Sequence, residues 1–245
     1  ALGIAAGIAV RRAGASLPAA ALAGLLAGEG PDLDVFIRSA GDPLVSFRWH
    51  RHFTHSFAFA PVWGLLAALI SAWFFRRRPD AHWRDLLLPG LAGALSHVLC
   101  DACTSYGTML LWPFDTGRYA WDCLPIIDLF ATLPVLVLAI LAWKKAAPRL
   151  AVYGLVWFTS YALLGVWQHA RAETALRQWF ASQQVTRRIE RVAVKPTALN
   201  LVVWRCVWLE DGKWHTAAVR VMPFTDPQVI VGETRASVTP ATPGL

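Results

Sequence analysis

The chain has 245 residues, of which 56% are hydrophobic and 16% are charged, and its formal net charge is +7. So apolar a composition, with so little charge, excludes an ordinary soluble domain of this length and indicates an integral membrane protein. The basic residues stand at the ends of apolar runs rather than on one soluble segment. The positive charge therefore does not predict a nucleic-acid partner.

The first apolar runs are short. Residues 1–10 and 17–27 are too short for full crossings, so we expect them to be tilted, truncated or re-entrant. The sequence starts inside the first of these runs and without Met, and we expect the natural chain to begin earlier.

Longer runs follow. Residues 57–75 and 150–167 contain no charged residue over 19 and 18 positions, close to the roughly 20 that a bilayer core requires. Two further spans with polar ends are expected at 86–100 and 126–143. The segment 102–125 is rich in Gly, Pro and aromatic residues, and we expect it to form an interfacial loop that covers a site.

The last third of the chain has a different composition. A polar helix is expected to about Gln184, followed by strands at 188–195, 199–210 and 213–222. Asp211-Gly212 predicts a hairpin, because a tight primed turn needs the positive φ angles that Gly accepts. Residues 237–245 are expected to be disordered.

The expected fold class is therefore mainly α, with two domains. Residues 1–170 form a polytopic transmembrane helical domain, and residues 171–245 form a polar helix and a small β-rich extramembrane module. Short loops rich in Lys and Arg stay cytoplasmic, and three such clusters occur at 11–12, 76–78 and 144–149. If all three are cytoplasmic, the acidic and imidazole residues between them face the periplasm or cell exterior.

Candidate metal ligands gather at the ends of the apolar runs, where ionisable groups are costly and a functional site is the default hypothesis. His97 and Asp101 are four apart, so on a helix they share one face. Asp32 and Asp34 are two apart, and an extended segment after Pro31 would place both carboxylates on one side. The predicted ligand set is Asp32, Asp34, His50, His55, His97 and Asp101.

The histidine cluster leaves two readings open. In the first, metal is bound by all three of His50, His52 and His55. In the second, only two of them bind metal, while the third orients a ligand or contacts substrate. We favour His50 and His55 as the ligands. Mixed imidazole and carboxylate ligands suit zinc, manganese or iron, with zinc the first choice. Six candidates are enough for one or two ions. Asp128, with Asp34 as the second candidate, is the predicted catalytic carboxylate, although Asp128 also fits a helix N-cap.

Other polar residues near the histidines are candidates for binding substrate or for orienting the metal ligands. Arg48, Arg51 and Arg118 suit an anionic group of a substrate, with lipid anchoring as the alternative. The hydroxyls of Thr54, Ser56 and Thr104 are expected to orient ligands by hydrogen bonds rather than act as nucleophiles. A disulfide between Cys103 and Cys123 on an oxidising face is a hypothesis that the sequence leaves open, whereas His82, His169 and His215 are expected to be structural.

Three segments together resemble the YdjM-like family of membrane-bound, metal-dependent hydrolases. The family pattern contains Pro-Asp-x-Asp, His-Arg-Gly-x-Thr-His-Ser and His-x-x-x-Asp-x-x-Thr-x-x-Gly. The matching segments here are Pro31–Asp34, His50–Ser56, and His97 through Asp101, Thr104 and Gly107, followed by Pro113-Phe114 and Ile126-Ile127-Asp128. The resemblance covers roughly residues 1–143. His52 stands where the family commonly has Gly, and the Thr-His or Thr-Gln element that usually leads the family is absent.

The resemblance implies hydrolysis by metal-activated water at a bacterial-type inner membrane. The expected substrate is a lipid-linked or amphiphilic phosphoester at the outer interface, because the predicted site lies at span ends beside Arg and aromatic residues. Membrane lipids are the other expected partners. The alternative is a non-enzymatic membrane protein with a structural or transport metal site.

Overall fold

The computed structural model describes residues 1–42, 44–183, 189–222 and 224–236, which divide into two compact units. The first unit contains residues 1–121 and 129–162, and the second contains 122–128 and the chain from Leu163. The first seven elements are α1 (Leu2–Ala9), α2 (Leu17–Glu29), η1 (Pro31–Phe36), α3 (Val45–Trp49), η2 (Phe53–His55), α4 (Ala60–Phe74) and α5 (Trp83–Ala102). Helices α6 (Leu129–Lys144) and α7 (Pro148–Ser182) follow, and α7 runs from the first unit into the second.

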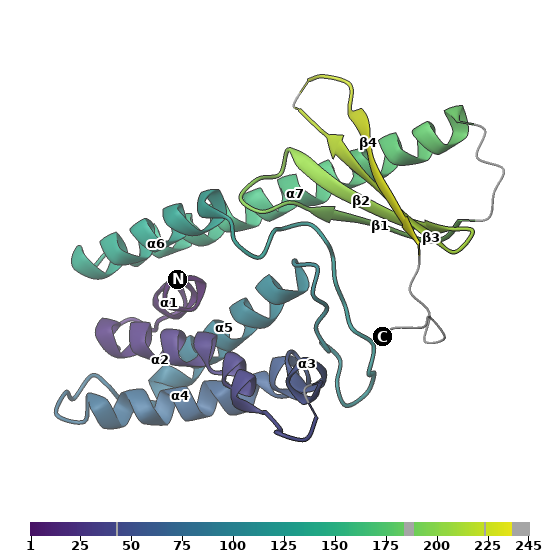
Figure 1. Ribbon diagram of the computed structural model, residues 1–245. Coiled ribbons are helices and arrows are strands. Elements are labelled where there is room, and N and C mark those ends of the chain that lie inside the picture. The colour runs from purple at the N-terminus through teal and green to yellow at the C-terminus, as the bar shows by residue number, and fades with distance from the viewer. Residues whose placement is uncertain (43, 184–188, 223, 237–245) are drawn as a thin grey trace. The chain divides into compact units, whose positions relative to one another are not determined.

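The core of the first unit is made of α1, α2, α4 and α5, which pack against one another (Figure 1). Glycines bring their backbones unusually close. A Cβ on Gly24 would lie 2.2 Å from the carbonyl oxygen of Gly3, and one on Gly93 would lie 2.3 Å from that of Gly24. Gly28 and Gly93 each stand four residues, about one helical turn, before Asp32 and His97. The close packing of these helices therefore places Asp32 and His97 near each other.

The helices match the expected apolar runs, but most are short. Among the described residues, only α7 is long and apolar enough to cross a membrane by itself. Segment 45–55 and α4, bent by 79° at a break, would form a second span if taken together. The mainly helical class is confirmed, while the polytopic character stays a prediction.

The second unit contains a four-stranded antiparallel sheet in the order β1 (Ile189–Pro196), β2 (Val203–Glu210), β3 (Lys213–Arg220) and β4 (Gln228–Ala236). The predicted hairpin is confirmed, since Asp211 and Gly212 have φ angles of 48° and 68° between β2 and β3. Strand β4 was not expected. The predicted disorder of 237–245 falls outside the described residues.

The expected interfacial loop after α5 contains no helix and no strand through Trp121. It is tied to the histidine segment by backbone hydrogen bonds, in which the N–H of Met109 donates to Arg51 and that of Phe57 donates to Leu110. The N–H of Trp121 donates to the carbonyl of Ala102, which closes the loop at the end of α5. The loop therefore holds segment 50–57 against α5.

The glycine contacts generate the first prediction. Gly24→Ala places a methyl group against a backbone oxygen that cannot rotate away, so α1 and α2 must separate. We expect a loss of about 1–3 kcal/mol in the free energy of unfolding, the usual cost of overpacking. In Gly154→Ala, the matched control on α7, the new Cβ meets its nearest neighbour at 3.5 Å. The control should unfold no more easily than the parent, because Ala favours the helix.

The measurement is the midpoint of thermal unfolding in detergent, monitored by the helical signal in circular dichroism. Equal midpoints for the Gly24 and Gly154 variants would contradict the assigned role of the glycine contacts.

Candidate metal centre

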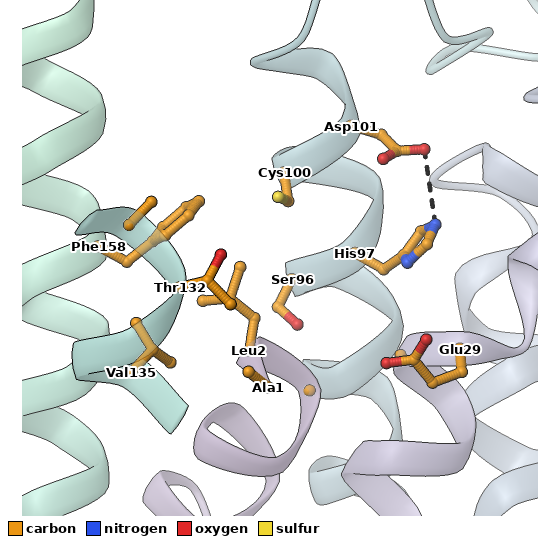
Figure 2. A pocket seen from close by; sticks show the side chains of 13 residues that line it. Ala1, Leu2, Glu29, Ser96, His97, Cys100, Asp101, Thr132, Val135 and Phe158 are labelled. Atoms are coloured by element: carbon orange, nitrogen blue, oxygen red, sulfur yellow. Dashed lines mark ion pairs between the residues drawn. The ribbon is translucent and has the colours of Figure 1, made fainter. Parts of the chain in front are cut away.

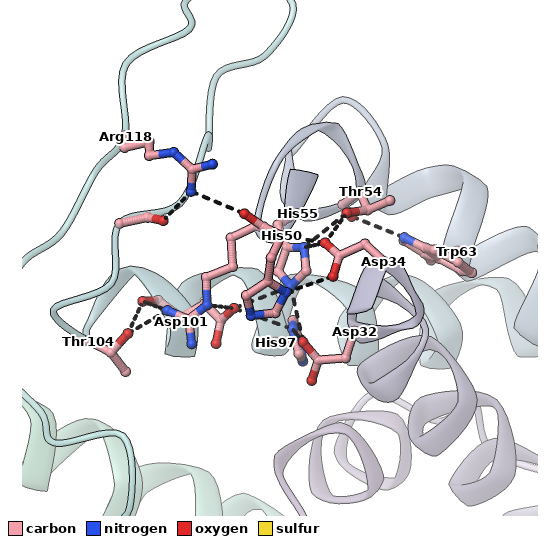
Figure 3. A network of polar contacts seen from close by, with 12 residues as sticks. Asp32, Asp34, His50, Thr54, His55, Trp63, His97, Asp101, Thr104 and Arg118 are labelled. Atoms are coloured by element: carbon pink, nitrogen blue, oxygen red, sulfur yellow. Dashed lines mark hydrogen bonds and ion pairs between the residues drawn. The ribbon is translucent and has the colours of Figure 1, made fainter. Parts of the chain in front are cut away.

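Four ligand candidates converge in the first unit. Asp32 comes from η1, His55 from η2, and His97 and Asp101 from α5. One ligand atom from each lies within 4.8 Å of the others. Figure 3 shows these side chains within the surrounding network of polar contacts. The predicted sharing of one helix face by His97 and Asp101 is confirmed, since their side chains lie 3.5 Å apart.

The separations between these atoms fit a common ion. The Nε2 of His55 lies 3.3 Å from Asp32 Oδ1 and 3.3 Å from Asp101 Oδ2. The Nε2 of His97 lies 3.6 Å and 3.5 Å from the same two oxygens. Tetrahedral zinc with bonds of roughly 2.0–2.2 Å places its ligand atoms about 3.4 Å apart. Four of the six separations therefore match the spacing around one such ion, and all four atoms lie within 4.8 Å of one another.

Burial and charge also fit a divalent cation. His97 Nε2 is buried without a hydrogen-bond partner, which is costly unless an ion or water satisfies it, and the buried Asp101 Oδ2 has ion-pair contacts but no hydrogen bond. Two carboxylates and two neutral imidazoles balance the charge of one divalent ion. The side chain of Asp32 is 49% exposed, whereas that of His55 is inaccessible and those of His97 and Asp101 are 13% and 12% exposed. The group is thus open to solvent mainly at Asp32.

Asp34 lies behind this group rather than in it. The expected extended backbone here is wrong, because Pro31–Phe36 form a 3₁₀ helix, in which residues two apart point in different directions. The Oδ2 of Asp34 accepts hydrogen bonds from the Thr54 hydroxyl at 2.8 Å and the Arg51 N–H at 3.0 Å. The same oxygen lies 3.1 Å from His55 Nδ1, which directs Nε2 of that ring toward the other ligands.

The electrostatics of Asp34 match this role. Its side chain is 2% exposed, and burial alone would raise the pKa of the carboxyl group. The imidazoles of His55 and His50 and the hydroxyl of Thr54 outweigh burial and lower that pKa to about 2. Asp34 is therefore a buried, charged acceptor whose hydrogen bonds orient the neighbouring rings.

His50 contacts Asp34 rather than the four converging atoms. Its Nδ1 lies 2.7 Å from Asp34 Oδ1, and its ring packs edge-on against Tyr106 with the centroids 5.2 Å apart. Tyr106 also lies under the guanidinium of Arg51, at 5.0 Å from the ring centroid. Sequence reasoning missed Tyr106, and no pattern in the sequence pairs it with the histidines.

Arg51 is a buried support of Asp101. Its Nε lies 3.0 Å from Asp101 Oδ2, and a terminal nitrogen donates to Thr104 Oγ1 at 2.6 Å. Thr104 in turn donates to the Asp101 carbonyl at 2.8 Å. The predicted hydroxyl role of Thr104 thus has a contact that supports it, whereas Ser56 bonds Phe53 and Phe59 at the start of α4.

The other residues predicted to bind substrate lie around a separate hollow. Arg48, His52 and Arg118 line a cavity of about 430 Å³ together with Phe47, Trp49 and Met109. Arg118 donates to the carbonyls of Arg48, His50 and Gly107, so it joins the loop to the histidine segment. Arg48 forms an ion pair with Asp42. Contact with a substrate stays a prediction for these residues.

Two predictions concern residues that belong to different units. Asp128 is buried in the second unit, while the four converging ligands belong to the first. Cys103 and Cys123 are also in different units. The catalytic role of Asp128 and the pairing of these cysteines therefore stay predictions.

Comparison with known proteins supports the expected family. A family model described as YdjM inner membrane protein matches residues 1–172, which include all four converging ligands. The inner membrane protein YbcI of Escherichia coli (strain K12) is 30% identical over 152 residues, covering 58% of this chain and 84% of YbcI. No solved structure matches. With its family match over more than half its length, the chain belongs to the YdjM family of inner membrane proteins.

Proposed function

We propose that the first unit is a metal-dependent hydrolase that acts on a lipid-linked or amphiphilic phosphoester at the outer face of the inner membrane. The observation that carries the proposal is the group of Asp32, His55, His97 and Asp101, whose ligand atoms lie close enough together to bind one ion. Family membership supports the membrane location.

Zinc fits the group best, with manganese or iron as alternatives. Two nitrogen and two oxygen donors suit a borderline cation, whereas calcium and magnesium prefer oxygen ligands alone. One ion accounts for the four converging atoms. A second ion would have to use His50 or Asp34, and both Asp34 oxygens already have hydrogen-bond partners.

A bound divalent ion lowers the pKa of a water molecule and polarises a phosphoryl oxygen. The protein residues position the ligands. Asp34 fixes the tautomer of His55, and Arg51 holds Asp101. Asp32 forms the exposed edge, where water and substrate have access. Both oxygens of Asp34 already accept hydrogen bonds, which makes Asp34 a poor candidate for the general base, and the role proposed for Asp128 is tested below.

The amphiphilic substrate is supported by the surroundings of the group. Phe47, Trp49 and Phe114 are exposed on the α3 segment and the loop after α5, and aromatic side chains favour the membrane interface. The basic clusters 11–12, 76–78 and 144–149 support an orientation with the ligands on the periplasmic side.

One observation favours a structural role instead. Four protein ligands complete a tetrahedral zinc site, while catalytic zinc usually has three and an open position. The exposure of Asp32 opposes this alternative, because a carboxylate at the surface can shift or give way to water. Metal removal separates the two roles, since a structural ion stabilises the fold and a catalytic ion is needed mainly for turnover.

The main test is metal analysis of the detergent-purified protein and of the His97→Ala, Asp101→Ala double variant. We expect about one ion per parent chain and a strong loss in the variant, together with loss of bis(p-nitrophenyl) phosphate hydrolysis. The control, Asp115→Ala, changes an exposed carboxylate in the loop and should keep both properties. Metal without turnover, with a large fall in the unfolding temperature after chelation, would favour the structural role, and no metal would reject the site.

The second test concerns Asp34. Replacing it by Asn removes the charge that orients His55, and residues behind metal ligands typically contribute 10–100-fold to affinity. We expect zinc affinity, measured by competition with a chelating dye, to fall by about that factor in Asp34→Asn and also in Thr54→Ala. The matched control is Asp42→Asn, whose carboxylate pairs with Arg48. If both site variants bind zinc as tightly as the control, the orienting role is wrong.

The third test concerns Asp128. As a general base it should support turnover without holding the metal, so Asp128→Ala should lose at least about 100-fold in rate, the low end for acid–base catalysis, and keep its ion. Asp122→Ala, in the same segment, is the control. A variant that loses its fold, seen by circular dichroism, would instead assign Asp128 a structural role.

A further inference from the structure

A cavity of about 190 Å³ lies directly beside the ligand group in the first unit (Figure 2). It is bounded by residues of α1, α2, α5, α6 and the first half of α7. Two of the residues that line it, His97 and Asp101, are members of the converging four. A molecule in the cavity would therefore touch two residues of the proposed metal site.

The walls of the cavity differ in chemistry. Leu2, Val135 and Phe158 form an apolar side that faces α5, as Figure 2 shows. Ser96 and Thr132 add small hydroxyl groups, which tolerate either a polar or an apolar neighbour. Polar groups at one end and an apolar wall at the other are the arrangement that recognises an amphiphilic molecule.

Charge restricts what the apolar part can hold. Glu29 lines the cavity, and no Lys or Arg side chain does. A second anionic group in the cavity, away from the ion, would be repelled by Glu29 and Asp101. The occupant of the apolar end must therefore be uncharged, while its anionic group stays at the ion, where the positive charge is.

We propose that this cavity is a subsite for the alkyl chain attached to the scissile phosphoester. The inference rests on the proposed hydrolase function and defines the substrate as one with a hydrocarbon group next to the phosphorus-bearing end. An apolar cavity of roughly 150 Å³ accommodates a benzene molecule, so the observed volume admits a chain of about six carbons. A longer chain would continue beyond the cavity.

The test uses equilibrium binding, so it does not depend on finding the natural substrate. Methylphosphonate and hexylphosphonate share an anionic head for the ion, and only the second has a chain for the cavity. Each buried methylene contributes about fourfold to affinity, so the five extra methylenes of hexylphosphonate should tighten its binding to the zinc-loaded, full-length protein roughly a thousandfold if all are buried, and by more than about tenfold if only two are. Isothermal titration in detergent measures both constants, and zinc content is determined on the same samples.

The decisive variant is Thr132→Phe, which fills the cavity from an exposed position on α6. We expect it to remove the preference for the hexyl chain while zinc content and methylphosphonate affinity stay as in the parent. Leu133→Phe is the matched control, because Leu133 is the next residue, is exposed and does not line the cavity. The control should keep the full preference.

The outcomes separate the two proposals. Equal affinities for the two phosphonates in the parent, or a preference that Thr132→Phe leaves unchanged, would overturn the alkyl subsite while the metal site stands. Absence of zinc, or of binding by both phosphonates, would reject the hydrolase proposal and the subsite with it. A preference lost only in the Thr132 variant supports the subsite.

Discussion

The ligand group depends on a single buried carboxylate, that of Asp34. A carboxylate with 2% exposure is strongly unfavourable unless its oxygens are paired, and here each oxygen has a partner. Those partners, His50, Thr54 and His55, all come from the segment between α3 and α4. Satisfying one buried charge therefore fixes the conformation of that segment and points His55 Nε2 at the other ligands.

Helix packing supplies the second half of the site. His97 and Asp101 are placed by α5, whose distance from α2 is set by backbone contacts at glycines. A side chain at Gly93 would force α5 away from α2 and separate Asp32 from His97. Arg51 then links the two halves, because its backbone N–H bonds Asp34 and its guanidinium bonds Asp101. Arg51 thus connects the segment that is fixed by Asp34 with the helix that provides His97 and Asp101.

Much of this could be predicted from the sequence, for identifiable reasons. The hairpin at Asp211-Gly212 depends on local turn chemistry, and the pairing of His97 with Asp101 depends on helix periodicity, so both were predictable. The different positions of Asp32 and Asp34 were not, because they depend on a 3₁₀ helix that Pro31 begins. Strand β4 was missed although Val229, Ile230 and Val231 are typical strand residues. The ion pair between Arg51 and Asp101 joins residues that are 50 positions apart, and a single sequence contains no pattern that predicts such a contact.

The access routes to the ligand group bear on what the site can do. Asp32 is exposed to solvent, while His97 and Asp101 border a cavity with an apolar wall. A purely structural ion gains nothing from either feature, because exposure weakens ligand binding and a cavity removes packing contacts. Water on one side and room for a hydrocarbon group on another are both required when an amphiphile is hydrolysed. The ligand set alone is compatible with either role, and it is the surroundings of the four residues that favour chemistry.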